Sequence, residues 1–370
     1  MGSTKLFPSE PEDFYPEVRR RVSDYFHDHG ISRYANRLFW IKALVHITGI
    51  IAGYAILLTN GAVSSGWLWG GYLVYLMSAG LFVINVAHDA SHQAVSRNRR
   101  VNKLLAYSWN LVGMSRRIWE AKHHESHHVH TNLPFLDVDI PENPFIRFNQ
   151  AYRWRPWFRY QHLYTPILFF LFGPYQVFVK DFLLCFFERH RFRDLRLKES
   201  DFPIRMMITK MVFVGYGLLL PWHILNLPFV EIAAVYLASI SITGFLIIVI
   251  LAIPHMNESG AWLGPVPDVR FRDNWALLQV KTTVDSSPHS NFMAWMTGGL
   301  HTHLAHHLFP HVCHVHYLAI TKIIRKTLRR RGIVYHSMSF GELLLSHFIF
   351  LRNTGRAPEV QPVLQAVTTT

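Results

Sequence analysis

Charged residues and cysteines are both scarce in this chain of 370 residues. Asp, Glu, Lys and Arg make up 16% of it, whereas hydrophobic residues make up 50%. The only cysteines are Cys185 and Cys313, and no CxxC pair or Cys/His spacing typical of a zinc site occurs. Two thiols cannot form a disulfide framework, and the polar N-terminal segment lacks the apolar run of a secretory signal peptide. Nothing therefore indicates a disulfide-stabilised secreted protein.

Acidic residues are the rarer of the charged residues. The 24 Asp and Glu stand against 37 Lys and Arg, which gives a net charge of +13. An excess of this size fits the positive-inside bias of a membrane protein, and it also fits an acidic partner or substrate head group. The basic residues flank apolar blocks, so nucleic acid is not an expected partner.

Four apolar blocks are long enough to cross a bilayer as helices. They are Ala43–Val63, Trp67–Ala87, Met211–Phe229 and Ile232–Ile253. The connections within the first pair and within the second pair are short and nearly uncharged, so we expect two helical hairpins. A shorter block, Tyr164–Val179, contains prolines and is expected to form an interfacial or re-entrant helix.

Runs of Lys and Arg flank these blocks at Arg97–Arg100, 188–198 and 322–331. The positive-inside rule places these runs and both termini on the cytosolic side of a bacterial inner membrane or of the endoplasmic reticulum. Asn102–Met114 is expected to form a further surface helix. The expected fold is an all-α integral membrane protein with four transmembrane helices in two hairpins, interfacial helices and a cytosolic cap. The expected divisions are a cytosolic segment at 1–42, a membrane domain at 43–356 and an unstructured tail at 357–370.

Histidine is abundant, with 24 residues, and many of these fall in three clusters. The first is HDASH at His88–His92, directly after the second apolar block. The second is KHHESHHVHTN at Lys122–Asn132, and the third is HTHLAHH at His301–His307. A single candidate, His255, follows the fourth apolar block.

The spacing within the clusters suits metal ligation. Residues four apart share one face of a helix, as in the pairs His88/His92, His123/His127 and His303/His307. Adjacent histidines, in His127–His128 and His306–His307, diverge by about 100° and can face two metal positions. The three clusters supply more ligands than one ion holds, so we expect a dinuclear site. Imidazole suits iron, zinc and copper, and the spacing does not choose among them.

Other residues near the clusters are candidates for orienting the ligands, because a carboxylate that accepts the outer N–H of an imidazole fixes the ring. The acidic residues beside the clusters are such candidates: Asp89, Glu125, Asp137, Asp139 and Glu258. Solvated positions suit Asp89 and Glu125 equally well. His314 is a further candidate, while His46, His190 and His223 are expected to be ordinary packing or surface residues.

The three clusters, read as HDASH, KHHESHHVHTN and GGLHTHLAHHLFPHVCHVHY, resemble the histidine boxes of membrane fatty acid desaturases. TNLPFLDVDI resembles the segment after the second box, and NWALLQVKTTVDSSP resembles the approach to the third. The likeness runs from the first apolar block to SHFIFLRN, and it is strongest to the linoleoyl-CoA desaturase-like branch. It implies two irons with the ligands His88, His92, His123, His127, His128, His255, His303, His306 and His307.

The chain departs from that branch in places. Many relatives have Gln at the position of His303, and LAIPH stands where LAH is usual before the ligand that matches His255. Both differences bear on substrate and regiochemistry. His124 falls on a position that is not usually a ligand. It is a candidate for contact behind the ligands, and it is also an alternative to His123 as the ligand.

The resemblance implies that an acyl chain, carried by CoA, an acyl carrier protein or a lipid, is desaturated with O2 and two electrons at the bilayer surface. No HPGG haem motif is present, so a separate donor is expected, such as ferredoxin or cytochrome b5 with its reductase. We expect a narrow apolar tunnel, with Trp109, Trp119 and Trp275 as candidate lining. Candidates for binding a phosphate-bearing head group, or alternatively for anchoring at the membrane surface, are Arg97, Arg99, Arg100, Arg116 and Arg117.

Other functions remain open from the sequence. The same scaffold suits hydroxylation, epoxidation or alkyne formation on an acyl chain. A metal- or haem-binding transporter is the rival from another class, and it predicts histidines and carboxylates inside the spans. In this chain the histidine clusters lie outside them. A single-zinc hydrolase is a weaker rival, because no HExxH motif occurs.

Overall fold

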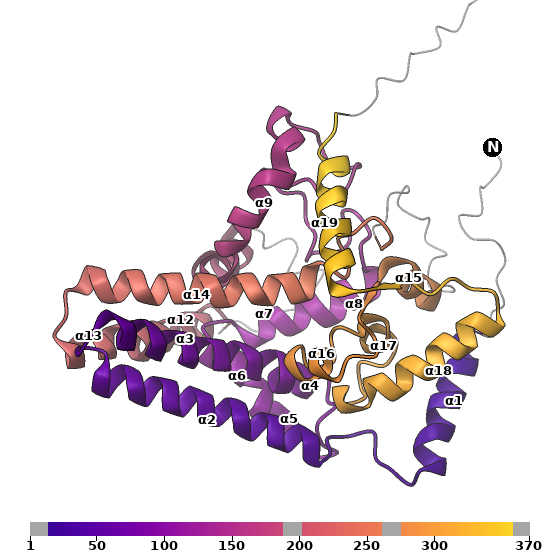
Figure 1. Ribbon diagram of the computed structural model, residues 1–370, viewed down its shortest axis with the longest axis horizontal. Coiled ribbons are helices and arrows are strands. Elements are labelled where there is room, and N and C mark those ends of the chain that lie inside the picture. The colour runs from indigo at the N-terminus through magenta and orange to yellow at the C-terminus, as the bar shows by residue number, and fades with distance from the viewer. Residues whose placement is uncertain (1–13, 188–201, 261–274, 358–370) are drawn as a thin grey trace, which may run out of the picture.

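The computed structural model describes residues 14–187, 202–260 and 275–357, which fold mainly into helices (Figure 1). The basic run at 188–198 and the predicted tail, apart from Ala357, lie outside the described residues. Long helices lie side by side, and shorter helices gather at one end of them, around the segments that carry the histidine clusters (Figure 1).

The described residues contain four helical stretches that are long and apolar enough to span a membrane, as the sequence predicts. The first stretch is α2, and the second joins α3 through the π-helix η1 to α4. The third joins α12, the π-helix η6 and α13, and the fourth is α14. Their bounds are Arg37–Asn60 (α2), Ser65–Phe82 (α3), Val83–Ala87 (η1), His88–Ser91 (α4), Phe202–Val214 (α12), Gly215–Leu219 (η6), Leu220–Leu225 (α13) and Phe229–Ala252 (α14).

The third span differs from its predicted bounds. Met211–Phe229 was the expected segment, whereas the apolar helix runs from Pro203 to Leu225. Asn226 adopts a left-handed conformation with φ 53° and ends the helix, and Pro228 precedes the next one. These residues sit in an apolar run, so hydropathy alone places the turn inside the span. The helix also begins earlier and includes Lys210, whose charge is paired with the buried carboxylate of Asp181 at 2.7 Å.

Small residues allow close approach between the long helices. A Cβ atom on Gly53 of α2 would overlap the backbone of Tyr75 in α3. A Cβ atom on Gly244 of α14 would likewise overlap Gly173, in the short helix that crosses it. Membrane helices use such positions because close backbone packing replaces the hydrophobic driving force that is absent in lipid. These contacts set the spacing of the helices that line the cavity described below.

The segment predicted at Tyr164–Val179 forms a bent pair of helical stretches. Pro156–Phe170 and Phe172–Phe186 meet at Leu171 with a bend of 64°. A bend of this size fits a re-entrant segment or a broken span. The pair consists of η3 (Pro156–Tyr160), α9 (Gln161–Phe170), α10 (Phe172–Tyr175), η4 (Gln176–Lys180) and η5 (Leu183–Phe187).

Most of the remaining helices are short, and α18 and α19 are the longer ones among them. The surface helix expected at Asn102–Met114 is replaced by α5 and α6, which are separated at Tyr107. A two-stranded parallel sheet pairs Asp285 of β1 with Ser337 of β2. The bounds are Arg99–Ala106 (α5), Ser108–Leu111 (α6), Arg116–Glu120 (α7), Ala121–His127 (η2), His128–His130 (α8), Trp275–Thr282 (α15), Asp285–Ser286 (β1), Asn291–Met296 (α16), His303–Leu308 (α17), His314–His316 (η8), Tyr317–Arg330 (α18), Ser337–Met338 (β2) and Phe340–Thr354 (α19).

The described part of the N-terminal segment belongs to the histidine-bearing end of the molecule. Helix α1, Phe14–Asp28, packs along α18 (Figure 1). Its buried residues Phe14, Val18 and Val22 join one apolar cluster with Ile324 and Leu328 of α18. The same cluster includes Leu304 and Ala305 of α17, so this packing supports the helix that carries the third histidine cluster.

Candidate metal centre

The three histidine clusters lie on helical segments of different geometry. His88 and His92 follow the π-helix η1, at the end of the second span. His123 and His127 lie within the π-helix η2. A π-helix has more residues per turn than an α-helix and often occurs at functional sites. The third cluster lies on the regular α-helix α17, where the Asp285 carboxylate accepts a hydrogen bond from the Leu304 N–H at 2.9 Å.

Nitrogen atoms of the clusters converge into two groups, each with its ligand atoms within 4.8 Å of one another. His88 and His92 lie in the first group, and His303 and His307 in the second, so each of these i, i+4 pairs stays together. The adjacent residues His306 and His307 divide between the groups. The first group is His88, His92, His123 and His306, and the second is His127, His255, His303 and His307.

His128 lies between the two groups. Its Nε2 atom is 3.1 Å from Nε2 of His123 and 3.0 Å from Nε2 of His306, both in the first group. It also forms a ligand set with His306 and His307, which spans both groups. The nine histidines that the resemblance implies as ligands are therefore brought together.

Within the groups, Nε2 atoms face one another at short distances. Nε2 of His255 is 2.7 Å from Nε2 of His303 and 3.2 Å from Nε2 of His127. In the first group, Nε2 of His88 is 3.2 Å from Nε2 of His123. Two imidazole nitrogens bound to one ion at about 2.1 Å, as for zinc, lie about 3.0–3.4 Å apart at bond angles of 90–109°. The two separations of 3.2 Å, one in each group, fit a common metal ion, whereas the His255–His303 separation is shorter than this range.

The outer nitrogens of several rings have acceptors, which fixes the ring orientation. The Nδ1–H of His127 donates to Asp137 Oδ2 at 2.9 Å. Nδ1 of His255 and of His303 donate to the backbone oxygens of Thr282, at 3.1 Å, and Leu300, at 2.9 Å. A proton on Nδ1 leaves Nε2 with its lone pair, directed inward. This is the usual arrangement of a metal-binding histidine and its supporting acceptor.

Burial keeps most of these imidazoles neutral. It is the main reason why the pKa values of His92, His123, His128, His255, His306 and His307 lie well below the ordinary value, and neighbouring imidazoles lower them further. Burial lowers the pKa of His303 to about 3. In His127, burial acts in the same direction, but the Asp137 carboxylate outweighs it and raises the pKa.

The donor set and its unpaired atoms fit bound metal. Buried Nε2 atoms of His92 and His307 have no hydrogen-bond partner among the described residues. A buried polar atom without a partner costs about 1–3 kcal/mol, and a metal ion would satisfy these atoms. Neutral imidazoles are ligands for iron, zinc and copper alike.

A chain of buried polar groups stands behind His88. The Nδ1–H and the backbone N–H of His314 both donate to Asp89 Oδ2, at 2.8 and 2.9 Å. Lys42, from the first span, donates to Nε2 of His314 at 2.8 Å. The other carboxylate oxygen of Asp89 lies 3.7 Å from Nδ1 of His88. Asp89 and His314 thus lie directly behind the first group, as candidates for orienting the ligands. A contact of Lys42 with this site was not predicted from the sequence.

Other predicted site residues lie outside the two groups. His124 packs beside His92, with ring centroids 4.2 Å apart, and its Nε2 atom is 3.5 Å from the hydroxyl of Ser91. Glu125 is exposed. Asp137, one of the carboxylates expected beside the clusters, contacts His127. Tyr317 was missed as a contact of the ligands, and its hydroxyl lies 3.4 Å from Nδ1 of His306.

The five arginines that are candidates for binding the substrate head group lie in two separate places. Arg97, Arg99 and Arg100 are exposed around the start of α5. Arg116 and Arg117 begin α7, where Arg116 pairs with Glu120 at 2.8 Å. None of the five lines the cavity that reaches the histidines.

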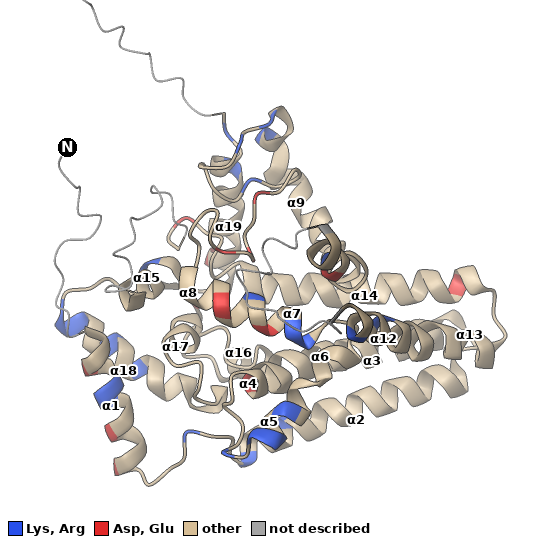
Figure 2. Ribbon diagram, turned by 180° about the vertical axis from the view of Figure 1, so that it is seen from behind, with Lys and Arg blue, Asp and Glu red and all other residues tan. Residues whose placement is uncertain are grey.

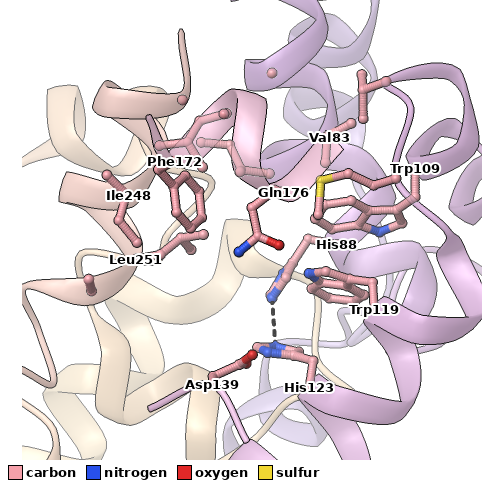
Figure 3. Close-up of a pocket in the computed structure, with 18 of the residues that line it drawn as sticks. Val83, His88, Trp109, Trp119, His123, Asp139, Phe172, Gln176, Ile248 and Leu251 are labelled. Carbon is pink, nitrogen blue, oxygen red and sulfur yellow. Dashed lines mark hydrogen bonds between the residues drawn. The ribbon is translucent and has the colours of Figure 1, made fainter. Parts of the chain in front are cut away.

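An apolar cavity of about 210 Å³ ends at the histidine groups (Figure 3). The second helical stretch lines it from Leu76 in α3 to His88 in α4, and one face of α14 lines it from Ile240 to Ala252. Twelve residues of helix separate Leu76 from His88, a length of about 18 Å. At the far end Leu76 and Ile240 line the cavity together with Val177 and Phe213, and all four belong to one buried apolar cluster.

Aromatic and polar side chains line the cavity near the histidines. Trp119 stacks on His123 with ring centroids 4.5 Å apart, and Trp109 stacks on Trp119 at 4.1 Å. Both tryptophans and the Gln176 amide point into the cavity (Figure 3). Trp275 does not line it; its indole N–H donates to the backbone oxygen of His128 at 2.8 Å.

Comparison with known proteins identifies the family. The model of the fatty acid desaturase family matches residues 64–339, which include all three histidine clusters. The chain belongs to the fatty acid desaturase family. It is therefore an oxidoreductase that acts on fatty acyl chains, with four apolar helices suited to a membrane and a histidine cluster suited to metal.

Individual relatives of this desaturase cover nearly the whole chain. A protein of Synechocystis sp. named sn-1 linoleoyl-lipid 6-desaturase is 28% identical over 359 residues, which is 94% of this chain and 97% of the relative. An Arthrospira platensis protein of the same name is 28% identical over 363 residues, 95% of each chain. An acyl-lipid (8-3)-desaturase of Physcomitrium patens is 30% identical over 94% of this chain and 72% of its own length.

The contact between His127 and Asp137 gives a first testable prediction. Asp137→Asn keeps the shape of the side chain but removes the charge that orients His127. We expect the affinity for metal to fall about 10- to 100-fold, as is usual when an acceptor behind a ligand is lost. Metal retained after dialysis against a graded series of chelator concentrations measures the effect. Asp24→Asn, at an exposed position on α1, is the matched control; equal retention by both variants and the wild type would contradict the orienting role.

Proposed function

We propose that this desaturase introduces a C=C bond into the acyl chain of a membrane lipid, using O2 and two electrons at a di-iron centre. The observation that carries the proposal is the position of the two histidine groups at the end of an apolar cavity. The names of the relatives, which are acyl-lipid desaturases, support a lipid rather than a CoA ester or acyl carrier protein as the carrier.

The proposed ligands are the four histidines of each group together with His128. When bound, the two irons supply the oxidising power from O2 that an unactivated methylene requires. The chain supplies position and exclusion of water. The cavity walls on α3 and α14 hold the acyl chain, and Trp109 and Trp119 confine it beside His88 and His123. No side chain needs to act as a nucleophile or as a base toward the C–H bond.

Electron balance requires a donor outside the acyl substrate. Desaturation removes two hydrogen atoms, and with them two electrons, from the chain. Reduction of O2 to two molecules of water consumes four electrons and four protons. We propose that a separate one-electron carrier, such as ferredoxin or cytochrome b5 with its reductase, delivers the other two electrons in two steps.

We also propose that the four apolar helices form two transmembrane hairpins with both termini in the cytosol. The close packing of α2 against α3, and the short turn between α13 and α14, support the hairpins. The histidine-bearing segments would then form a cytosolic cap over the membrane, where the head of a lipid lies. The cavity would extend about 18 Å from this cap along α3. One leaflet of the hydrocarbon core is about 15 Å thick, which matches an acyl chain reaching inward.

Product analysis tests the proposed function. The chain is expressed in a host that lacks polyunsaturated lipids, linoleoyl lipid is supplied, and extracted lipids are derivatised for mass spectrometry. A new double bond in a lipid-bound chain is the expected result. A hydroxylated, epoxidised or acetylenic product would instead favour the related reactions on the same scaffold. The metal content of the purified protein tests the di-iron mechanism. Zinc in place of about two irons per chain would overturn it.

We propose that Arg116 and Arg117 bind the head group of the substrate. They begin α7, the helix that continues into the second histidine cluster. The variant Arg116→Ala/Arg117→Ala is expected to raise the KM for the acyl substrate up to about fivefold, because a partly exposed charge pair contributes about 1 kcal/mol or less. Initial rates across a range of substrate concentrations measure this. Arg153→Ala/Arg159→Ala, at exposed positions, is the control. An unchanged KM in the α7 variant would remove the head-group role.

A further inference from the structure

Six exposed cations surround the start of α5: Arg33, Arg37, Arg97, Arg99, Arg100 and Lys103. We call this set the α5 surface. It is built from three stretches of chain, 29–37, 92–106 and 309–313, and none of them contains Asp or Glu. None of the six cations forms an ion pair with an acidic residue in the described part of the chain. Figure 2 shows the Lys and Arg residues gathered on α5, and the acidic residue of the neighbouring helix α4, Asp89, is buried.

Backbone hydrogen bonds hold the three stretches together. The Ala35 N–H donates to the backbone oxygen of Val95 at 3.1 Å, and the Cys313 N–H donates to that of Arg33 at 3.0 Å. The buried Asn102 side chain accepts hydrogen bonds from the backbone N–H groups of Val95 and Ser96, at 3.2 and 3.1 Å. The cations are therefore presented by a fixed backbone rather than by a long free loop.

His311 joins this surface to the first histidine group. Its side chain is exposed, and its Nδ1–H donates to the backbone oxygen of His92 at 2.8 Å. The His92 ring lies in the same group as His88 and His123. A path from the His311 ring to the His92 ring thus consists of covalent bonds and a single hydrogen bond. An electron arriving at His311 meets no gap through space wider than that hydrogen bond.

We propose that the α5 surface docks an acidic one-electron carrier protein, and that electrons enter the centre through His311. This inference rests on the proposed function, because the reaction there needs two electrons from outside. In each of two steps the reduced carrier gives up one electron and leaves oxidised, and the centre gains that electron. Charge complementarity favours an acidic carrier, since opposite surface potentials speed encounter and fix orientation.

Two other positions compete with this assignment. Helix α18 also presents exposed cations, among them Lys322, Lys326 and Arg329, but no described contact joins them to a histidine of the two groups. Anionic lipid is the other candidate partner of the α5 surface, because Leu104 and Leu111 nearby are 72% and 59% exposed. The link through His311 favours the protein carrier, because binding of a lipid head group does not require a path for electrons to the centre.

The triple variant Arg33→Gln/Arg37→Gln/Lys103→Gln tests the docking surface. These three cations were never candidates for binding the acyl head group, so a loss of substrate binding cannot imitate the effect. With an acidic [2Fe–2S] ferredoxin, kept reduced by its reductase, the KM for ferredoxin is expected to rise about tenfold at low salt. The difference should largely vanish in about 1 M NaCl, where the Debye length is about 3 Å. Lys322→Gln/Lys326→Gln/Arg329→Gln removes the same charge from α18 and should leave the KM unchanged.

A small reductant separates docking from catalysis. Dithionite with methyl viologen needs no protein surface, so the α5 variant should then match the wild type in desaturation rate. His311→Leu should lower kcat with ferredoxin several-fold without changing its KM, and should also match the wild type with dithionite. An equal loss with both reductants would show that His311 only supports the structure near His92.

The remaining outcomes are distinguishable from one another. An unchanged ferredoxin KM in the α5 variant overturns the proposal, and a raised KM in the α18 variant alone moves the docking site there. If phosphatidylglycerol in phosphatidylcholine nanodiscs stimulates the wild type but not the α5 variant, at equal ferredoxin KM, the surface binds anionic lipid instead. A wild type that forms no double bond even with dithionite would refute the proposed function rather than this surface.

Discussion

Replacing His127 and His306 together by alanine is expected to remove the bound metal and to abolish desaturation. The variant takes one ligand from each group, because His306 belongs to the first and His127 to the second. Both rings are buried, so a water molecule does not readily replace the lost imidazole as a metal ligand. Loss of an acceptor behind a ligand already costs about 10- to 100-fold in affinity or activity. Loss of a ligand from each group should lower activity by more than about 100-fold.

Elemental analysis of the purified protein is the measurement, with iron per chain set against the wild type. A matched control is His27→Ala/His223→Ala, which removes two exposed histidines far from the groups. The thermal unfolding midpoint of both variants shows whether the fold persists. Retention of wild-type iron and activity by a folded His127→Ala/His306→Ala protein would contradict the proposed centre.

Much of the fold follows from hydropathy and helix length. Blocks of apolar residues long enough for a bilayer predict the four long helices, because backbone groups in lipid must bond within a helix. Helix ends were harder to predict. The turn at Asn226 lies inside an apolar run, and its left-handed backbone is a local conformational choice that hydropathy does not record. The division between α5 and α6 at Tyr107 is equally local.

The histidine groups show where periodicity succeeds and where it stops. The i, i+4 rule describes His303 and His307, which lie together on a regular α-helix. The same spacing also places His123 and His127 side by side, with ring centroids 5.5 Å apart, yet these two rings belong to different groups. Both residues lie on the π-helix η2. A π-helical segment depends on the surrounding packing, so the sequence does not predict where it forms.

Residues that act behind the ligands were the least predictable. Lys42 lies in an apolar span and reads as an isolated charge, yet its ammonium contacts His314 across 272 positions of sequence. The carbonyls of Thr282 and Leu300 have no side-chain signature at all. Such contacts depend on the three-dimensional meeting of distant segments. They explain why the clusters and nearby supports such as Asp89 and His314 could be recognised, while Lys42 and the backbone acceptors could not.

Filling the cavity at Ala79 is expected to change which acyl chains the desaturase accepts. Ala79 lines the cavity on α3, nine residues before His88, which is about 13 Å along the helix. In Ala79→Phe the new ring would occupy the space beyond that point. Chains that extend past it must displace the ring or stop short of the centre, at an overpacking cost of about 1–3 kcal/mol. Activity on long chains should fall at least about tenfold, whereas shorter chains should keep most of theirs.

The comparison that decides this uses a series of chain lengths and counts double bonds in each product by mass spectrometry. Ala52→Phe adds the same ring on the exposed side of α2, so it controls for the effect of a large side chain in a span. The argument depends on the acyl chain lying along α3, with its reacting carbon beside His88. If Ala79→Phe lowers activity equally at every length, the ring disturbs the centre itself. If it has no effect at any length, the chain lies elsewhere and the cavity is not its path. Only a loss that grows with length supports the cavity as the ruler that positions the reacting carbon.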